Sequence, residues 1–202
     1  MQKRCNYIYN IYNIYNIYNS IFMKLIVWLG NPWAEYALTR HNAWWLALDM
    51  VCEAFETTPF LPQKKFDSSI AQGMIKKRQC LFVKPDTFMN KSGSAVQKIM
   101  AFYKINHEDV LVIHDDLDLP TGTVKLKFNG WHGGQNGMRD IIEKCWSPRF
   151  WRIKIGIWRP EHVEQTPTDW VLGKYTPEQI EVLKQQKKEI LSRVDDFLRN
   201  SW

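Results

Sequence analysis

The residues best suited to acid–base chemistry in this 202-residue chain are His41 and Asp115. His41 lies in the polar segment Thr-Arg-His-Asn, and Asp115 comes two residues after the apolar run Val-Leu-Val-Ile. An imidazole can act as a general base near neutral pH, and a carboxylate can orient it. Because the chain has no Gly-x-Ser-x-Gly segment and no cysteine beside a predicted strand end, the pair favours activation of water over a covalent intermediate. The pattern alone leaves a second interpretation open, since a lone histidine near a helix start is more often a capping or surface residue.

The elements that must position these residues are apolar runs that alternate with helical patterns, an order typical of an α/β domain on a largely parallel sheet. Ligands of such sheets bind outside the carboxyl ends of the strands, so we expect polar residues that follow the strands to meet there. The loop 131–137 is flexible enough to bring backbone amides and the side chain of Asn136 against a ligand. Strands are predicted at 24–29, 79–84, 110–113, 123–128 and 152–158, and helices at 43–55, 92–103, 138–145 and from the capping box at Thr176 onward.

The composition is that of an ordinary globular protein, with 45% hydrophobic and 24% charged residues. No apolar stretch is long enough to span a membrane. The net charge of +6 makes a polyanionic partner plausible, and nucleic acid is the first partner to test. The four cysteines are widely spaced, which argues against a metal knuckle or a disulfide framework and fits a reducing cytoplasm.

The first 22 residues form a low-complexity extension that contains four copies of Ile-Tyr-Asn. This repeat has neither a helical nor a strand period, so we expect it to stay outside the core, as a disordered tail or as a segment that is not physiological. The first convincing strand follows Met23 at once. We therefore hypothesise that the protein starts at Met23 and predict one domain over 23–202.

Five polar motifs follow one another along this domain, and together they resemble the bacterial peptidyl-tRNA hydrolase family. The resemblance extends from Met23 to the final helix. The motifs are Leu29-Gly30-Asn31-Pro32, Thr39-Arg40-His41-Asn42-Ala43, Thr87-Phe88-Met89-Asn90-Lys91-Ser92-Gly93, His114-Asp115-Asp116-Leu117-Asp118-Leu119-Pro120 and His132-Gly133-Gly134-Gln135-Asn136-Gly137.

The resemblance implies a single α/β domain with a twisted, mostly parallel but mixed central sheet flanked by helices. It also implies a cytoplasmic monomer that hydrolyses the ester between a peptide and the 3′ ribose of tRNA, without a metal or another cofactor. In that family's pattern, His41 activates water, Asp115 stabilises its basic form, and Asn31 distinguishes blocked from unblocked aminoacyl-tRNA. Positions that contact tRNA or peptide are Tyr36, Phe88, Asn90 and Asn136, and positions that bind tRNA phosphates are Lys125, Lys127, Arg152 and Lys154.

Structural interpretations stand beside these roles. Tyr36 and Phe88 could be core aromatics, and the alternation of Lys125 and Lys127 also describes a solvated strand face. Two other functions are considered. A non-catalytic RNA-binding protein of the same fold would combine a basic face with a broken catalytic set, whereas the set here is intact. A phosphatase would use the Asp-x-Asp pair Asp116 and Asp118, which more readily terminate a strand and bind turn amides than a metal.

Tryptophan is as frequent as glycine in this chain, with 10 residues of each. At positions where the family has glycine, a large side chain is expected to strain a turn at positive φ, as at Trp33, or to hinder approach to the site, as at Trp131. We hypothesise that the codons concerned are UGA, read as glycine in the source and translated here as tryptophan. The six positions are Trp28, Trp33, Trp44, Trp131, Trp146 and Trp158.

Overall fold

The computed structural model describes residues 23–42, 48, 51–159 and 166–200. The predicted extension 1–22 lies outside these residues, so its fate and the start at Met23 stay predictions. Within the described part, no helix is long and apolar enough to cross a membrane.

A single sheet forms the centre of the described chain, with strands in the order β2-β3-β4-β1-β5-β7-β6. The four central strands are parallel: β4 and β5 both pair with β1, and β7 pairs with β5. The edges are antiparallel, since β2 and β3 form one border and β6 pairs with β7 at the other. The expected mixed, mostly parallel sheet is therefore confirmed. The strands are β1 Lys24–Trp28, β2 Leu61–Gln63, β3 Ser68–Ile75, β4 Arg78–Pro85, β5 Val110–Asp116, β6 Val124–Phe128 and β7 Trp151–Gly156.

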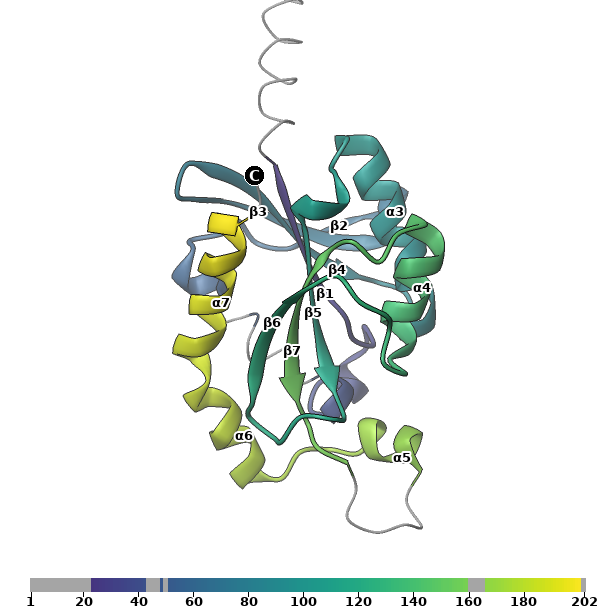
Figure 1. Ribbon diagram of the computed structural model, residues 1–202, viewed down its shortest axis with the longest axis vertical. Coiled ribbons are helices and arrows are strands. Elements are labelled where there is room, and N and C mark those ends of the chain that lie inside the picture. Colours follow the sequence, from purple (N-terminus) through teal and green to yellow (C-terminus); the bar gives the residue numbers. More distant parts are fainter. Residues whose placement is uncertain (1–22, 43–47, 49–50, 160–165, 201–202) are drawn as a thin grey trace, which may run out of the picture.

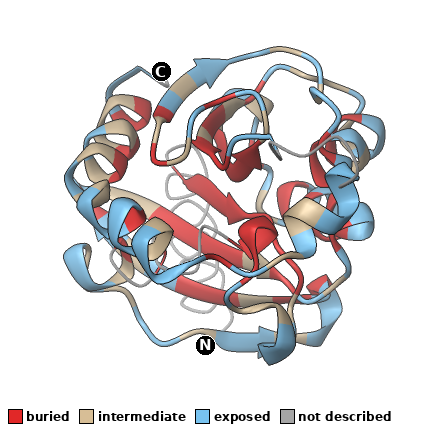
Figure 2. Ribbon diagram, turned by 90° about the horizontal axis from the view of Figure 1, so that it is seen from below, coloured by how far each residue is buried: buried red, intermediate tan, exposed pale blue. Residues whose placement is uncertain are grey.

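Helices cover both faces of the sheet, as Figure 1 shows. Helices α3 Ser92–Tyr103 and α4 Asn136–Cys145 pack on one face, and α6 Pro177–Gln185 and α7 Lys187–Asn200 pack on the other. Because β1 and β5 are covered on both faces, their apolar residues are buried throughout (Figure 2). The short helices η1 Ala34–Tyr36, η2 Arg40–Asn42, η4 Met89–Lys91 and α5 Pro167–Leu172 lie beyond the carboxyl ends of the central strands (Figure 1).

Most predicted elements are confirmed, and α3 has the predicted bounds. The single final helix was wrong, because the chain leaves helical geometry at Gln186 and divides into α6 and α7. Its predicted capping box at Thr176 is present. Strand β3 was not predicted. It joins β4 through Lys76 and Lys77, which both have positive φ in a turn that usually carries Asn-Gly. Of the predicted helix 43–55, the described residues 48 and 51–54 are helical.

Of the five tryptophans at family glycine positions that the structure describes, two have the backbone conformation that favours glycine. Trp146 ends α4 with φ of 55°, and Trp158 follows β7 with φ of 53°. This conformation costs a residue with a Cβ about 1–2 kcal/mol, so it supports glycine at these positions. Trp33 has φ of −93° and is extended, so the expectation of positive φ there was wrong.

Trp28 supports the same hypothesis for a different reason. Its side chain is fully buried and stacks on Phe82 with ring centroids 5.7 Å apart. Its indole Nε1–H has no hydrogen-bond partner in the described part of the chain, which leaves a buried donor unsatisfied. Trp44 lies outside the described residues, and recoding of all six codons stays a prediction.

Candidate active site

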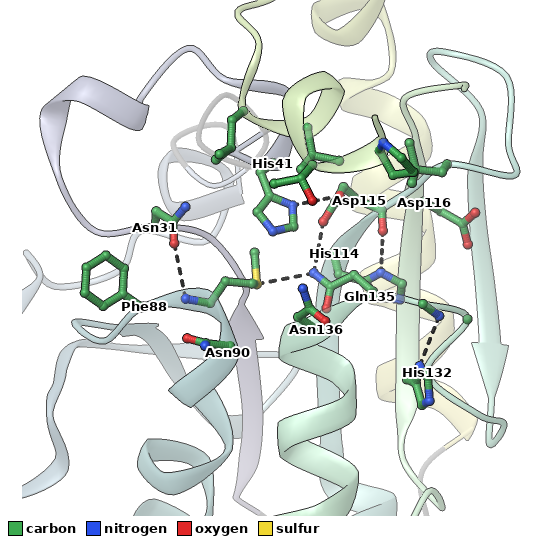
Figure 3. A pocket seen from close by; sticks show the side chains of 18 of the residues that line it. Asn31, His41, Phe88, Asn90, His114, Asp115, Asp116, His132, Gln135 and Asn136 are labelled. Atoms are coloured by element: carbon green, nitrogen blue, oxygen red, sulfur yellow. Dashed lines mark hydrogen bonds and ion pairs between the residues drawn. The ribbon is translucent and has the colours of Figure 1, made fainter. Parts of the chain in front are cut away.

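A cavity of about 580 Å³ opens at the carboxyl end of the sheet. Its walls come from the end of β5, from η2 and η4, from the start of α4 and from α5, which are distant in sequence (Figure 3). Six of the predicted site residues line it: Asn31, His41, Phe88, Asn90, Asp115 and Asn136. The sequence-based expectation that polar residues after the strands meet at this edge is confirmed.

His41 and Asp115 form a direct, buried pair in this cavity. The carboxylate accepts a hydrogen bond on Oδ2 from His41 Nδ1 over 2.9 Å, and both residues are less than one-tenth exposed. Because an ionised carboxylate only accepts, Nδ1 carries the proton and Nε2 of the neutral ring is the nitrogen with a free lone pair. This tautomer is the one that a general base requires.

The environment of Asp115 keeps its carboxylate ionised. Burial by itself raises the pKa of Asp115, but the neighbouring His41 and the hydrogen bonds from His41 and Gln135 outweigh burial and hold the pKa below its usual value. The charged carboxylate can therefore stabilise an imidazolium when His41 takes up a proton.

The turn that carries His41 is held in place by its neighbour Arg40. The Arg40 guanidinium lies 3.6 Å from the ring centre of Trp170 in α5 and donates to the Trp170 carbonyl over 3.3 Å. Its backbone N–H donates to the carbonyl of Gly173. Arg40 is buried, so these contacts fix η2 against α5, which forms the adjoining wall of the cavity.

Asn31 is oriented by hydrogen bonds on its backbone and its side chain. Asn42 clamps its backbone, accepting from Asn31 N–H and donating to Asn31 C=O over 2.9 Å each. The side-chain Oδ1 of Asn31 accepts from the N–H of Met89 over 3.2 Å. Since Oδ1 is used in this way, the NH₂ group of Asn31 is the end that can donate to a bound ligand.

The remaining predicted contact residues lie at the rim. Asn90 and Asn136 are exposed and lie in η4 and at the start of α4. Phe88 is 50% exposed, and its ring packs against Trp33 with centroids 4.5 Å apart. Tyr36 is only partly buried and touches Trp33, but it does not line the cavity. Neither aromatic ring is a core residue.

Comparison with known proteins assigns the family. The model of the peptidyl-tRNA hydrolase family matches residues 25–202. The chain belongs to the peptidyl-tRNA hydrolase family. It is 40% identical to the peptidyl-tRNA hydrolase of Mesoplasma florum over 179 residues, which are 89% of this chain and 95% of the relative. The Marinomonas enzyme is 42% identical over 88% of this chain and 91% of its own length. A crystal structure of peptidyl-tRNA hydrolase from Acinetobacter baumannii superposes with a TM-score of 0.80 at 36% identity, covering 88% of this chain and 89% of that one.

The four basic residues of this peptidyl-tRNA hydrolase family member lie on one face of the β6–β7 pair, where Lys125 is opposite Lys154 and Lys127 is opposite Arg152. Lys125 and Lys127 are exposed, and Lys154 forms an ion pair with Asp116. Arg152 is only 2% exposed, and its guanidinium donates to the carbonyls of Trp131 and Pro148 over 2.9 and 3.1 Å. Burial lowers the pKa of Arg152 to about 10.

The position of Arg152 limits what it can do for a bound polyanion. Its guanidinium is already committed to two backbone carbonyls, and it is not on the surface as the family pattern led us to expect. The exposed part of the basic face consists of Lys125 and Lys127. Trp131, whose carbonyl Arg152 holds, is 79% exposed and does not line the cavity, so the expected obstruction of the site by its side chain is absent.

Both carboxylates of the Asp-x-Asp pair, Asp116 and Asp118, interact with basic side chains. Asp116 pairs with Lys154, and Asp118 accepts from Arg159 Nε over 3.0 Å. Among the residues that the structure describes, no three His, Cys, Asp or Glu side chains gather as a set of metal ligands. Nothing in this arrangement favours a phosphatase.

Six polar residues that line the cavity were not predicted as site residues: His114, Asp116, His132, Gln135, Arg159 and Thr168. Gln135 contacts Asp115, His114 lies beside it on β5, and Arg159 is at the rim. Gln135 and His114 belong to two of the quoted motifs, so their types were visible in the sequence. The directions of their side chains depend on where α4 begins and on how far β5 extends, and the predicted bounds missed both.

Proposed function

We propose that this chain hydrolyses the ester between a peptide and the 3′ ribose of tRNA, with His41 as the base that activates water. The observation that carries the mechanism is the pairing of His41 Nδ1 with the buried Asp115 carboxylate at the wall of the cavity. Membership of the peptidyl-tRNA hydrolase family supports the choice of substrate.

In this mechanism, Nε2 of His41 accepts a proton from water while the water oxygen attacks the ester carbonyl. The bond to the 3′ oxygen then breaks, and the imidazolium returns the proton to that leaving oxygen. Asp115 stabilises the imidazolium between the two steps. General-base catalysis of this kind typically contributes about 10² to 10⁴ in rate.

The asparagines provide selectivity for a blocked amino group. The free NH₂ end of Asn31 can pair with the carbonyl of a peptide group, and Asn90 and Asn136 line the same cavity. An amide side chain cannot neutralise an unblocked α-ammonium, so a free aminoacyl-tRNA loses this pairing and keeps an uncompensated charge. We assign Phe88 and Tyr36 to contacts with peptide or tRNA at the rim.

We propose that Lys125 and Lys127 bind tRNA phosphates, with Lys154 beside them in its pair with Asp116. Arg152 supports this surface from below by fixing the Trp131 and Pro148 carbonyls. We further propose a cytoplasmic enzyme, because its tRNA substrate is cytoplasmic. We expect it to act as a monomer without metal or other cofactor.

The decisive experiment compares the cleavage of N-acetyl-aminoacyl-tRNA and unblocked aminoacyl-tRNA by the purified protein, with His41→Ala as control. Selective release of the blocked amino acid that depends on His41 and persists in a metal chelator supports the proposal. A folded protein that binds tRNA but releases nothing supports the alternative, a non-catalytic RNA-binding protein of this fold. Light scattering during the same purification tests the monomer.

A further inference from the structure

Gln135 occupies a junction between α4 and the catalytic pair. It is buried, lies immediately before α4 and caps that helix: its side-chain Oε1 accepts from the N–H of Met138 over 2.7 Å. Its Nε2 donates to Asp115 Oδ1 over 3.0 Å (Figure 3). The same nitrogen lies 3.3 Å from the sulfur of Met89, whose backbone N–H holds Asn31.

These contacts fix which end of the Gln135 amide faces the carboxylate. A flipped amide would direct its oxygen at ionised Asp115 and its NH₂ at a backbone N–H, so both contacts would become repulsive. The cap therefore determines that Gln135 presents a donor to Asp115. The carboxylate is then held at both oxygens, by His41 on Oδ2 and by Gln135 on Oδ1.

We propose that Gln135 is a positioning residue for the proposed base: its amide ties the carboxylate of Asp115 to the first turn of α4, so the helix that presents Asn136 to the substrate also sets the orientation of His41. The inference rests on the proposed function for the role of His41. It adds that binding at the start of α4 and the alignment of the base are mechanically linked through one side chain.

A simple helix cap is the competing explanation, and three variants separate the two. Gln135→Asn keeps a good capping residue but is one methylene shorter, so it cannot cap α4 and reach Asp115 together. Gln135→Glu keeps the length and the capping acceptor, and its charge suits a helix N-terminus, but it presents an acceptor to Asp115. Gln135→Met has similar length and removes both contacts.

Other ionisable groups around Asp115 stay constant across these variants. His114 lies next to it on β5 and favours its charged form, and the charge of Asp115 helps to raise the pKa of Tyr175, which follows α5. Arg40 acts on Tyr175 in turn. Because Gln135→Asn alters none of these groups and adds no ionisable group, a change in its pH dependence is assigned to the contact between Gln135 and Asp115.

The test combines steady-state hydrolysis of N-acetyl-aminoacyl-tRNA from pH 5 to 9 with thermal unfolding and NMR titration of the His41 ring in the full-length protein. For Gln135→Asn we expect a melting temperature close to that of the wild type, and for Gln135→Glu a lower one, because its carboxylate faces the buried Asp115. In both variants we expect kcat lowered on the order of tenfold, with KM within about twofold. The acid limb of the rate profile and the His41 ring titration should move to higher pH, most in Gln135→Glu, because Asp115 loses a donor and gains a like charge.

The proposal is overturned if Gln135→Asn and Gln135→Glu keep the wild-type kcat, pH profile and His41 ring titration. It is also overturned if only Gln135→Met loses activity and that loss parallels the fall in its melting temperature. If Gln135→Glu does not fold, the kcat, pH profile and His41 ring titration of Gln135→Asn test the proposal alone. A fully active His41→Ala contradicts the proposed function instead. The ring titration still reports on Gln135 in that case, so the two failures are distinguishable.

Discussion

The two ends of strands β1 and β5 each bury a pair of one basic and one acidic side chain, and the surroundings of the two pairs differ. At the amino end, Lys24 at the start of β1 pairs with Asp109 just before β5, with side chains 2% and 13% exposed. At the carboxyl end, His41 pairs with Asp115, with side chains 10% and 3% exposed. Only the second pair lines the large cavity.

Burial of an ionisable pair does not by itself mark a site of chemistry. Burial lowers the pKa of Lys24, and its pairing with Asp109 opposes that shift. Breaking this pair is therefore expected to change the free energy of unfolding and not the activity. The His41 ring has a second nitrogen that the pair does not use, and it lines a cavity. A buried pair becomes chemically useful when one of its members retains a free lone pair that a ligand can reach.

The largest expected effect comes from removing the base. His41→Ala should lower kcat/KM for N-acetyl-aminoacyl-tRNA by about 10² to 10⁴, while the melting temperature falls only modestly, because Gln135 still donates to Asp115. Steady-state kinetics and thermal unfolding measure the two effects. A loss of less than tenfold in a folded variant would contradict the role of His41.

The opposite pattern is expected at the amino end. Lys24→Met leaves Asp109 without its cation, so the free energy of unfolding should fall by about 3–5 kcal/mol. The activity per folded molecule should stay at the wild-type value. Urea unfolding and kinetics at low temperature measure both quantities. The double variant Lys24→Met with Asp109→Asn serves as control and should recover part of the loss, because no unpaired charge remains.

His114 provides a third, pH-dependent case, a buried ionisable ring next to the pair of His41 and Asp115. Burial, only partly opposed by Asp115, lowers the pKa of His114 from its ordinary 6.5 to about 4. Between pH 6.5 and 4 the unfolded chain binds a proton on His114 that the folded chain does not bind. The free energy of unfolding therefore has its full value above pH 6.5 and decreases as the pH falls toward 4. The loss amounts to about 3 kcal/mol.

Urea unfolding at several pH values tests this expectation. The wild type should lose stability across that window, and His114→Asn should lose less. Equal pH dependence of the two proteins would show that His114 is not responsible.

The exposed cations should affect binding and leave the chemical step unchanged. Lys125→Ala and Lys127→Ala should each raise KM a few-fold at constant kcat and reduce the slope of log affinity against log salt by about 1. Lys188→Ala in α7, an exposed lysine on the other side of the sheet, is the matched control. An effect on kcat alone would argue against phosphate contact.

The smallest effect is expected where α4 ends, at Trp146. Trp146→Gly removes a Cβ at positive φ and an exposed indole, so the free energy of unfolding should rise by about 1 kcal/mol. Trp170→Gly is the contrasting control and should destabilise, since Trp170 stacks on Arg40 and its Nε1 donates to the Trp158 carbonyl over 2.7 Å. Tandem mass spectrometry of the natural protein over Trp28, Trp33 and Trp146 decides whether glycine is present there.

The sequence predicted the elements whose residues obey simple periodicity and the residues that follow the strands. The His41 and Asp115 pair followed from the general rule that polar residues meet at the carboxyl ends of parallel strands. Strand β3 escaped prediction because its turn, Lys76 and Lys77, lacks the usual residues of a hairpin. The burial of Arg152 could not be predicted from the sequence either. Alternation along the strand assigns Arg152 to the same face as Lys127, but it cannot show which backbone carbonyls from distant loops cover the guanidinium.

The cavity draws its walls from segments between Asn31 and Leu172, which span most of the chain. Because α5 and the start of α4 both supply walls, the cavity cannot be complete before the segment that carries α5 has been synthesised. The cavity is therefore among the last parts of the described fold to be completed as the chain is synthesised.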